Sequence, residues 1–177
     1  MNFKAAQKKA VDNFTNPEFI ANIEEEEPNM VKQLDILKKI NKHGYLTTNS
    51  QSGIKTENYE ERSFIIGFML RKDAENFVHN MNMKTDKIAL CVVVSDTYAD
   101  RKIDIPLTME NKKGIWKSFT HMSTFVPFKY FNKEKQKIGL EPNTDVLYIF
   151  CLDPTWNRSA SSKTGLFTDV LKILKTI

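Results

Sequence analysis

Small hydrogen-bonding side chains gather in the segment 43–53. The candidates for contact with a ligand are the hydroxyl and amide side chains of Thr47, Asn49, Ser50 and Gln51. The segment follows a predicted helix end and a β-prone stretch. We therefore expect it to form a loop at a strand terminus, where ligand-contacting residues are often found. The alternative is an ordinary polar turn, in which Asn49 and Ser50 bond to their own backbone.

A charged pair, Glu61 and Arg62, stands just before an apolar strand predicted over 64–69. The planar guanidinium of Arg62 suits a carboxylate or a phosphate, and Glu61 could be its partner or an acid–base group. A surface ion pair of little energetic value is the alternative. Because consecutive strands are usually neighbours, we expect strands 45–48 and 64–69 to pair antiparallel. Arg62 would then turn toward the polar loop that contains Ser50.

A third group of candidates follows an apolar strand predicted over 146–152. Asp153 stands at the carboxyl end of that strand, Trp156 could stack on a ring, and Arg158 could hold an anion. The alternative is a capping loop, in which Asp153 makes a turn with Pro154 and Trp156 covers the edge of the core.

The first two groups belong to a longer pattern, Gly44-Tyr45-x-Thr47-x-Asn49-Ser50-Gln51-x-Gly53 followed by Glu61-Arg62-Ser63-Phe64-x-x-Gly67-Phe68. Over about 43–70 the chain resembles an uncharacterised family of actinomycetes and large DNA viruses. The family pattern has proline in place of Ser52 and alanine in place of Ser63. No known activity accompanies the resemblance. It implies that the polar positions form a site: Thr47, Asn49, Ser50, Gln51, Glu61 and Arg62.

Several enzyme classes lack their signatures in this sequence. His43, His79 and His121 are scattered and lack the spacing of metal ligands, so we predict no metal site. Nucleophile-elbow and dinucleotide-binding or Walker-type glycine motifs are absent, and we predict no cofactor. Cys91 and Cys151 lie inside apolar runs, which predicts buried, reduced thiols rather than activated nucleophiles. A bridge between these two cysteines is the less favoured alternative.

Composition limits the partners. The chain has 177 residues, 41% of them hydrophobic and 27% charged, which is typical of one globular domain. The net charge of +4 is small, and Lys is interspersed with Asp and Glu, so nucleic-acid binding should be weak and non-specific at most. The chain shows neither a membrane span nor the apolar core of a signal peptide, which predicts a reducing cytoplasmic setting, or a virion.

Aromatic residues are frequent between 116 and 131, where Lys117 and Lys129 also occur. Rings between cations can hold single-stranded nucleic acid. Their irregular spacing instead favours core packing plus one exposed interface.

Hydrophobic periodicity supplies the elements that position these groups. Helices are predicted in the first part of the chain, 1–43, with Asn16 capping a second helix at Pro17 and Gly44 ending a helix that starts near Pro28. In the second part, 44–177, strands and helices alternate. The elements expected there are a helix over 73–81, a central strand covered on both faces over 88–94, an edge strand at 103–107 with Pro106, a turn at 111–114, an extended aromatic segment over 125–131 and a final helix over 166–174.

These elements predict a single α+β domain over 1–177, with N-terminal helices followed by a mixed sheet and with helices packed mainly on one face. The leading functional hypothesis is an interaction or ligand-recognition domain whose partner is a protein or a small anionic ligand. The alternative is a small enzyme acting on a phosphate-bearing or nucleotide-like ligand, with the polar candidates and Asp153 around one pocket. A non-specific nucleic-acid binder is the weaker third hypothesis.

Overall fold

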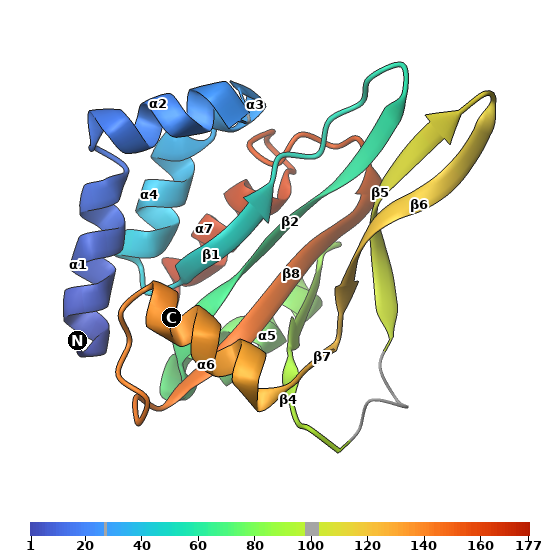
Figure 1. The fold of residues 1–177 in the computed structure, drawn as a ribbon. Helices are drawn as coiled ribbons and strands as arrows, with labels where there is room; N and C mark the ends of the chain where they lie inside the picture. Colours follow the sequence, from blue (N-terminus) through green and yellow to red (C-terminus); the bar gives the residue numbers. More distant parts are fainter. Residues whose placement is uncertain (27, 98–102) are drawn as a thin grey trace.

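Two long apolar strands, β2 (Tyr59–Leu70) and β8 (Val146–Trp156), pair antiparallel at the centre of the computed structural model (Figure 1). Beyond β8 lies β3 (Ile88–Cys91), and on the other side of β2 lie β1 (Leu46–Gln51) and β5 (Asp104–Lys112). The last strand, β6 (Ile115–Ser123), pairs with β5. The predicted antiparallel pairing of the 45–48 and 64–69 segments is therefore confirmed.

The structure describes residues 1–26, 28–97 and 103–177. Within these ranges every pairing of the main sheet is antiparallel, and the only parallel pairing joins the short strands β4 (Val93–Val94) and β7 (Phe125–Val126). The predicted α+β class is confirmed. The main sheet is thus antiparallel and the small second sheet parallel, so neither sheet of the described residues is mixed as predicted.

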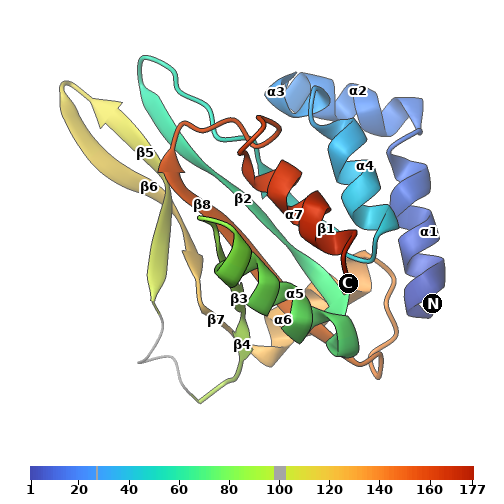
Figure 2. The ribbon, with the colours of Figure 1, turned by 180° about the vertical axis from the view of Figure 1, so that it is seen from behind.

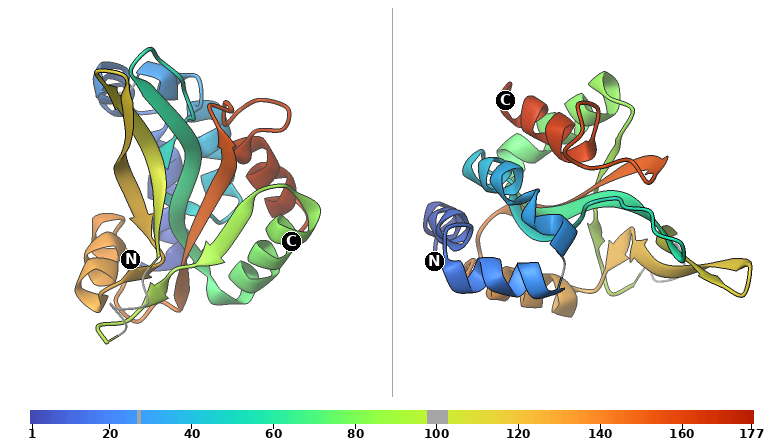
Figure 3. Two further views of the ribbon diagram at one scale, coloured as in Figure 1. Left: turned by 90° about the vertical axis from the view of Figure 1, so that its right-hand side faces the viewer. Right: turned by 90° about the horizontal axis from the view of Figure 1, so that it is seen from above.

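Helices cover the two faces of the sheet unequally. One face packs against α4 (Leu34–Lys42), α5 (Arg71–Lys84) and α7 (Leu166–Leu174). Seen from behind, α5 and α7 lie across β2 and β8 (Figure 2). The other face packs against α6 (Phe128–Lys137) and the start of α1 (Phe3–Asn13). Seen from above, the sheet forms a middle layer between these groups (Figure 3).

Alternation along β2 explains the two cores, because successive side chains of a strand point to opposite faces. Ile65 and Met69 belong to the core beneath α4, α5 and α7, whereas Ile66 and Phe68 belong to the opposite core. Two further helices, α2 (Pro17–Glu26) and α3 (Pro28–Val31), complete the N-terminal part.

Several positions of the sequence pattern serve the fold. The Tyr45 side chain is fully buried, and its hydroxyl donates to the carbonyls of Ile65 at 3.2 Å and Ile149 at 2.9 Å. Tyr45 thereby joins β1 to both central strands. Gly44 ends α4 with φ of +94°, a conformation that glycine adopts readily. A Cβ added at Gly67 would lie 2.1 Å from the Leu46 carbonyl oxygen, so β1 can approach β2 closely only at a glycine.

The structure corrects several predicted elements of the second half. The 88–94 segment is not a central strand: β3 ends at Cys91 and forms a sheet edge beside β8, with Ile88 and Val93 exposed. Conversely, the strand that contains Pro106 is interior, because the unpredicted strand β6 lies outside it. Pro106 is tolerated since the pairing of β5 with β2 involves only residues 108–110.

The aromatic segment after β7 is a helix rather than an extended stretch. Pro127 precedes the first turn of α6, and Asp96 accepts a hydrogen bond from the Phe128 amide at 3.1 Å. Phe131 then packs 5.5 Å from the Phe68 ring, which turns one side of α6 toward the sheet. The helix predicted from Pro28 is also interrupted, between α3 and α4.

Gly67→Ala should destabilise the protein by about 2 kcal/mol or more, because the new methyl group would overlap the backbone of β1 rather than a movable side chain. Urea denaturation measures the loss of unfolding free energy. Gly44→Asn is the matched control: no atom lies within 4 Å of a Cβ at this position, so only backbone strain is added. An equal loss in the two variants would show that the approach at Gly67 is not the constraint.

Candidate functional site

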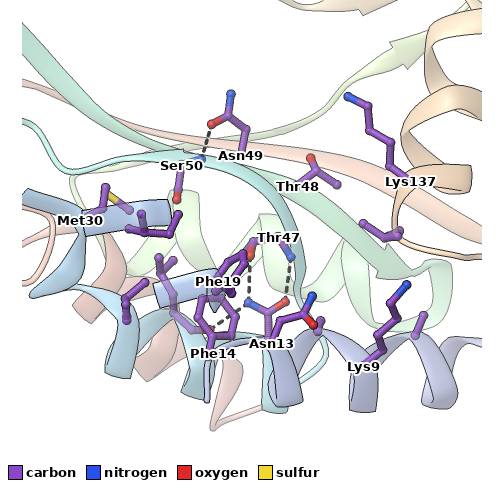
Figure 4. A pocket seen from close by; sticks show the side chains of 17 residues that line it. Lys9, Asn13, Phe14, Phe19, Met30, Thr47, Thr48, Asn49, Ser50 and Lys137 are labelled. Carbon is purple, nitrogen blue, oxygen red and sulfur yellow. Dashed lines mark hydrogen bonds between the residues drawn. The ribbon is translucent and has the colours of Figure 1, made fainter. Parts of the chain in front are cut away.

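A pocket of about 330 Å³ lies between the N-terminal helices and β1 (Figure 4). The apolar part of its lining comes from α1, α2, α4 and the α1–α2 connection and includes Ala10, Phe14, Phe19, Ile23, Leu34 and Leu37. The polar part comes mainly from α1, β1 and the end of α6 and includes Lys9, Asn13, Thr48, Asn49, Ser50 and Lys137. The site therefore combines an apolar interior with polar groups contributed by α1, β1 and the end of α6.

The corner between α1 and α2 positions the aromatic wall. Asn16 accepts a hydrogen bond from the Glu18 amide at 2.9 Å, which caps α2 as predicted, and Pro17 is its first residue. The reversal brings Phe14 and Phe19 into edge-to-face contact, with ring centroids 5.7 Å apart. Both rings are drawn near the middle of the pocket in Figure 4.

The β1 wall is attached to α4 through Asn41, which is completely buried. Its amide oxygen accepts from the Thr47 backbone at 3.0 Å, and its amide nitrogen donates to the Thr47 hydroxyl at 2.9 Å. Thr48 is also engaged, because its hydroxyl lies 3.2 Å from that of Tyr148. These two threonines hold the strand in place.

Asn49 and Ser50 differ from the threonines. A bulge between Thr47 and Asn49 shifts the register, so that Asn49 lies opposite Ile66 and Ser50 opposite Ile65. Since opposed residues share a face, Ser50 points toward the helices and Asn49 to the other side of the strand, as Figure 4 shows. In the described residues, the Ser50 hydroxyl has no hydrogen bond, and the Asn49 amide group bonds only the Ser50 backbone.

Positive charge lies beside these polar groups. Lys9 is exposed and forms no ion pair with any carboxylate that the structure describes, whereas Lys137 pairs with Glu134 at 2.5 Å. Both ammonium groups can move toward a ligand, because lysine side chains are long and flexible.

Gln51, Glu61 and Arg62 are outside this pocket lining. The Gln51 amide donates to the Arg62 carbonyl at 3.2 Å, so these residues are close, as predicted. The Arg62 side chain nevertheless turns the other way: its guanidinium lies 4.3 Å from the centre of the Trp156 ring and donates to the Pro106 carbonyl at 3.3 Å. The predicted orientation toward Ser50 is wrong, because β8 and β5 supply the partners of Arg62.

Burial lowers the pKa of Arg62, with an opposing contribution from Asp153. Its Nε atom is buried and has no hydrogen-bond partner among the residues that the structure describes. The carboxylate of Glu61 accepts from the Ile54 amide at 3.4 Å and thereby holds the chain that leads into β2. Both residues lie inside β2, not before it.

Asp153 and Arg158 belong to a buried charge network around Lys87, a residue that the sequence analysis missed. The side chains of Lys87 and Asp153 are both inaccessible to solvent, and the Lys87 ammonium lies 3.5 Å from Asp153 and 3.4 Å from Asp169. Arg158 lies 3.3 Å from Asp153 and 2.7 Å from Asp86, which also contacts Lys87. The network joins the turn before β3, the end of β8 and the start of α7.

The three groups of candidates were therefore expected in loops but lie largely in strands. Asn49, Ser50 and Gln51 are part of β1, and Asp153 and Trp156 are part of β8. The reason is the pairing partner: β8 continues past Leu152 because β2 extends far enough to place Arg62 opposite Trp156. Of the candidates, the pocket brings together only Thr47, Asn49 and Ser50.

The helical wall of the pocket was not predicted as part of a site. Phe14, Phe19 and Ile23 gave only the signal of helix faces, and nothing local indicates that β1 lies across from them. Lys87 gave a weak signal, as a single cation directly before an apolar strand.

The thiols do not contribute to either region. Both are free; Cys151 is fully buried, and burial raises its pKa to about 12, whereas Cys91 is only half-buried, contrary to prediction. In the part of the chain that the structure describes, no three His, Cys, Asp or Glu side chains are grouped to hold a metal ion. Nor does any described helix have the length and apolarity to cross a membrane.

Comparison with known proteins places the chain in one family. The family model described as Domain of unknown function (DUF6919) matches residues 12–177. The chain belongs to the DUF6919 family. The match covers nearly all of the α+β domain, including the Lys87 network and the pocket lining from Asn13 onward, whereas Ala6, Lys9 and Ala10 precede it. No curated protein matches the sequence.

Asp153→Asn should lower the unfolding free energy by about 3 kcal/mol or more, because it leaves the buried Lys87 charge less compensated. Asp145→Asn is the matched control: its ion pair with Arg71 at 2.8 Å is exposed to solvent and should contribute little to stability. Urea denaturation of the two variants measures the difference. Comparable losses would contradict a structural role for the buried network.

The network should also weaken in acid. Bonds from Lys87 and Arg158 hold the pKa of Asp86 at about 2, below its usual 3.8. A carboxylate with a depressed pKa contributes stability that is complete above its unfolded pKa and is lost as pH falls through its folded pKa. The midpoint of urea denaturation should therefore decrease as the pH is lowered from about 4 to about 2. Asp86→Asn should make this fall shallower, and an unchanged pH profile would exclude the contribution.

Proposed function

We propose that the protein is a ligand-recognition domain whose site is the pocket between the N-terminal helices and β1. The observation that carries the proposal is the pairing of an apolar interior with polar groups that the fold does not use. The ligand is inferred to be a small amphipathic molecule, with an apolar body and an anionic or hydrogen-bond-accepting end.

The apolar body follows from the lining. Phe14, Phe19, Ile23 and the two leucines of α4 supply the inner surface, and the volume of about 330 Å³ is that of a small-molecule site. A ligand that replaces water there gains the free energy of removing apolar surface from water.

The polar end follows from the groups that remain available. Lys9 supplies a positive charge, and the Ser50 hydroxyl, which points toward the helices, can donate a hydrogen bond. These residues lie on α1 and β1, so a head group placed between the two elements would contact both. Asn49 and Ser50 also belong to the sequence pattern shared with the uncharacterised family of actinomycetes and large DNA viruses, a resemblance that stays a prediction.

The catalytic alternative receives less support from the geometry. That hypothesis requires Gln51, Glu61, Arg62 and Asp153 around the same pocket, and none of them lines it. The two acidic residues bond elsewhere, to the Ile54 amide and to the Lys87 network. Recognition without a chemical step needs only the groups that do line the pocket.

The experiment fills the pocket. Ala10→Phe places a ring inside it, whereas Ala5→Phe places the same ring on the exposed side of the same helix. The probe is anilinonaphthalene sulfonate, which carries aromatic rings and one anionic group. Wild type and Ala5→Phe should show saturable fluorescence enhancement, and Ala10→Phe should lose it. Unchanged binding by a folded Ala10→Phe variant would refute the proposed site.

The charge preference has its own test. Octanoate should compete with the probe more strongly than octanol does, because only octanoate carries a charge for Lys9. Lys9→Met should weaken competition by octanoate several-fold and leave competition by octanol unchanged. Lys4→Met, an exposed lysine on the same helix outside the pocket lining, is the control and should bind both as wild type does. Equal competition by the two compounds would leave the anionic end unsupported.

A further inference from the structure

The β5–β6 hairpin projects from the body of the protein at the end of the sheet opposite the N-terminal helices (Figures 1 and 3). Its tip is a tight turn with positive φ at Lys113 and Gly114, and the Asn111 side chain accepts from the Gly114 amide at 2.8 Å. Such turns match the twist of paired strands. The hairpin is therefore a regular extension of the sheet.

The outer strand of this hairpin has a free edge. β6 is the last strand in the order β3–β8–β2–β5–β6, and no described strand pairs with its outer side. Residues 112–121 are all exposed. A row of unpaired backbone N–H and C=O groups along such an edge can accept another strand.

Large apolar side chains accompany the free edge. Phe119 is 60% exposed, Ile115 59% and Trp116 39%, and all three lie on β6. The nearby Tyr59 is also exposed, and its ring contacts that of Phe119 at 6.4 Å. Three large apolar residues on β6, with Tyr59 of β2 beside them, exceed the scattered exposure that is normal for a surface.

The charge of the strand identifies the kind of partner. β6 carries Lys117 and a histidine but no carboxylate, and Lys113 stands at the tip. Of the neighbouring lysines, Lys112 is neutralised by Glu110 at 2.8 Å, whereas Lys117 forms no ion pair with a described residue. A partner strand beside β6 would therefore contact one central positive charge with apolar residues on either side.

We propose that the edge of β6 binds an extended acidic segment of a partner protein, which joins the sheet as an additional strand. Backbone hydrogen bonds to β6 would supply the pairing, and apolar residues of the partner would cover Ile115, Trp116 or Phe119. An acidic residue of the partner would lie near Lys117. This surface is separate from the pocket, and the inference does not depend on the proposed function.

Two other occupants fit the surface less well. Tyr59 lies opposite Glu110, and Glu110 lies opposite Lys117, so these three side chains share one face of the sheet. Phe119 lies on the same face, because its ring contacts that of Tyr59. Trp116 neighbours Lys117 in sequence and so points to the other face. Trp116 therefore cannot join Tyr59 and Phe119 in stacking successive bases of one nucleic-acid strand, and those two rings contact edge to face rather than in parallel. A second copy paired antiparallel about Lys117 would place the two Lys117 side chains next to each other, which is unfavourable.

The experiment measures fluorescence anisotropy of a labelled peptide with alternating valine and glutamate. The full-length protein should bind this peptide and should bind its valine–lysine counterpart at least about tenfold more weakly. Lys117→Glu should weaken binding of the glutamate peptide at least about tenfold. Lys129→Glu makes the same charge change on exposed α6 and should bind as wild type does.

Hydrogen exchange locates the contact. Addition of the glutamate peptide should slow exchange of backbone amides within 115–121, and the pocket-filling Ala10→Phe variant should respond in the same way. The proposal is overturned if the glutamate peptide fails to bind, if Lys117→Glu binds it unchanged, or if protection appears elsewhere. Tighter binding of oligothymidylate than of the peptide, or a dimer in sedimentation that Lys117→Glu dissociates, would replace the proposed partner with nucleic acid or a second copy.

Discussion

The antiparallel pairing of β2 with β8 is the contact on which the rest of the structure depends. It runs from Leu70 opposite Val146 to Arg62 opposite Trp156, and the Tyr45 hydroxyl forms hydrogen bonds to carbonyls of both strands. Because the pairing continues beyond the apolar part of each strand, it carries polar residues into the sheet. Asp153 becomes completely buried in this way, and a buried carboxylate requires a compensating charge, which Lys87 and Arg158 provide.

Local signals predicted those elements whose boundaries are encoded locally. Asn16 and Pro17 start α2, Gly44 ends α4, and apolar periodicity marks α7. Strand lengths were not predictable in the same way, because a strand ends where its partner ends, and the partner is distant in sequence. The edge position of β3 and the helical state of α6 are likewise decided by tertiary packing, which overrides the local β-preference of aromatic and β-branched residues.

The residues of the candidate site likewise include some that local sequence predicts and others that depend on tertiary packing. Thr47, Asn49 and Ser50 could be proposed from their side chains alone, and they do line the pocket. The opposite wall, with Phe14 and Phe19, could not be assigned to them, since it depends on how the N-terminal helices pack across β1. The directions of Arg62 and Arg158 depend on Trp156 and on Asp86, each of which is far in sequence from the arginine that it contacts.

Hydrogen-bonding state separates the polar residues that maintain the fold from those that are free to bind. Thr47, Gln51 and Asp153 each bond to another segment of the fold, so their removal would disturb the packing of β1 or β8. Ser50 and Lys9 have no such bonds among the described residues, and no comparable loss of stability is expected from changing them. The same reasoning applies to the outer edge of β6, whose unpaired backbone groups and exposed rings contribute little to the core. Binding capacity in this fold is therefore expected along β1 and along β6, and not in the densely bonded centre between β2 and β8.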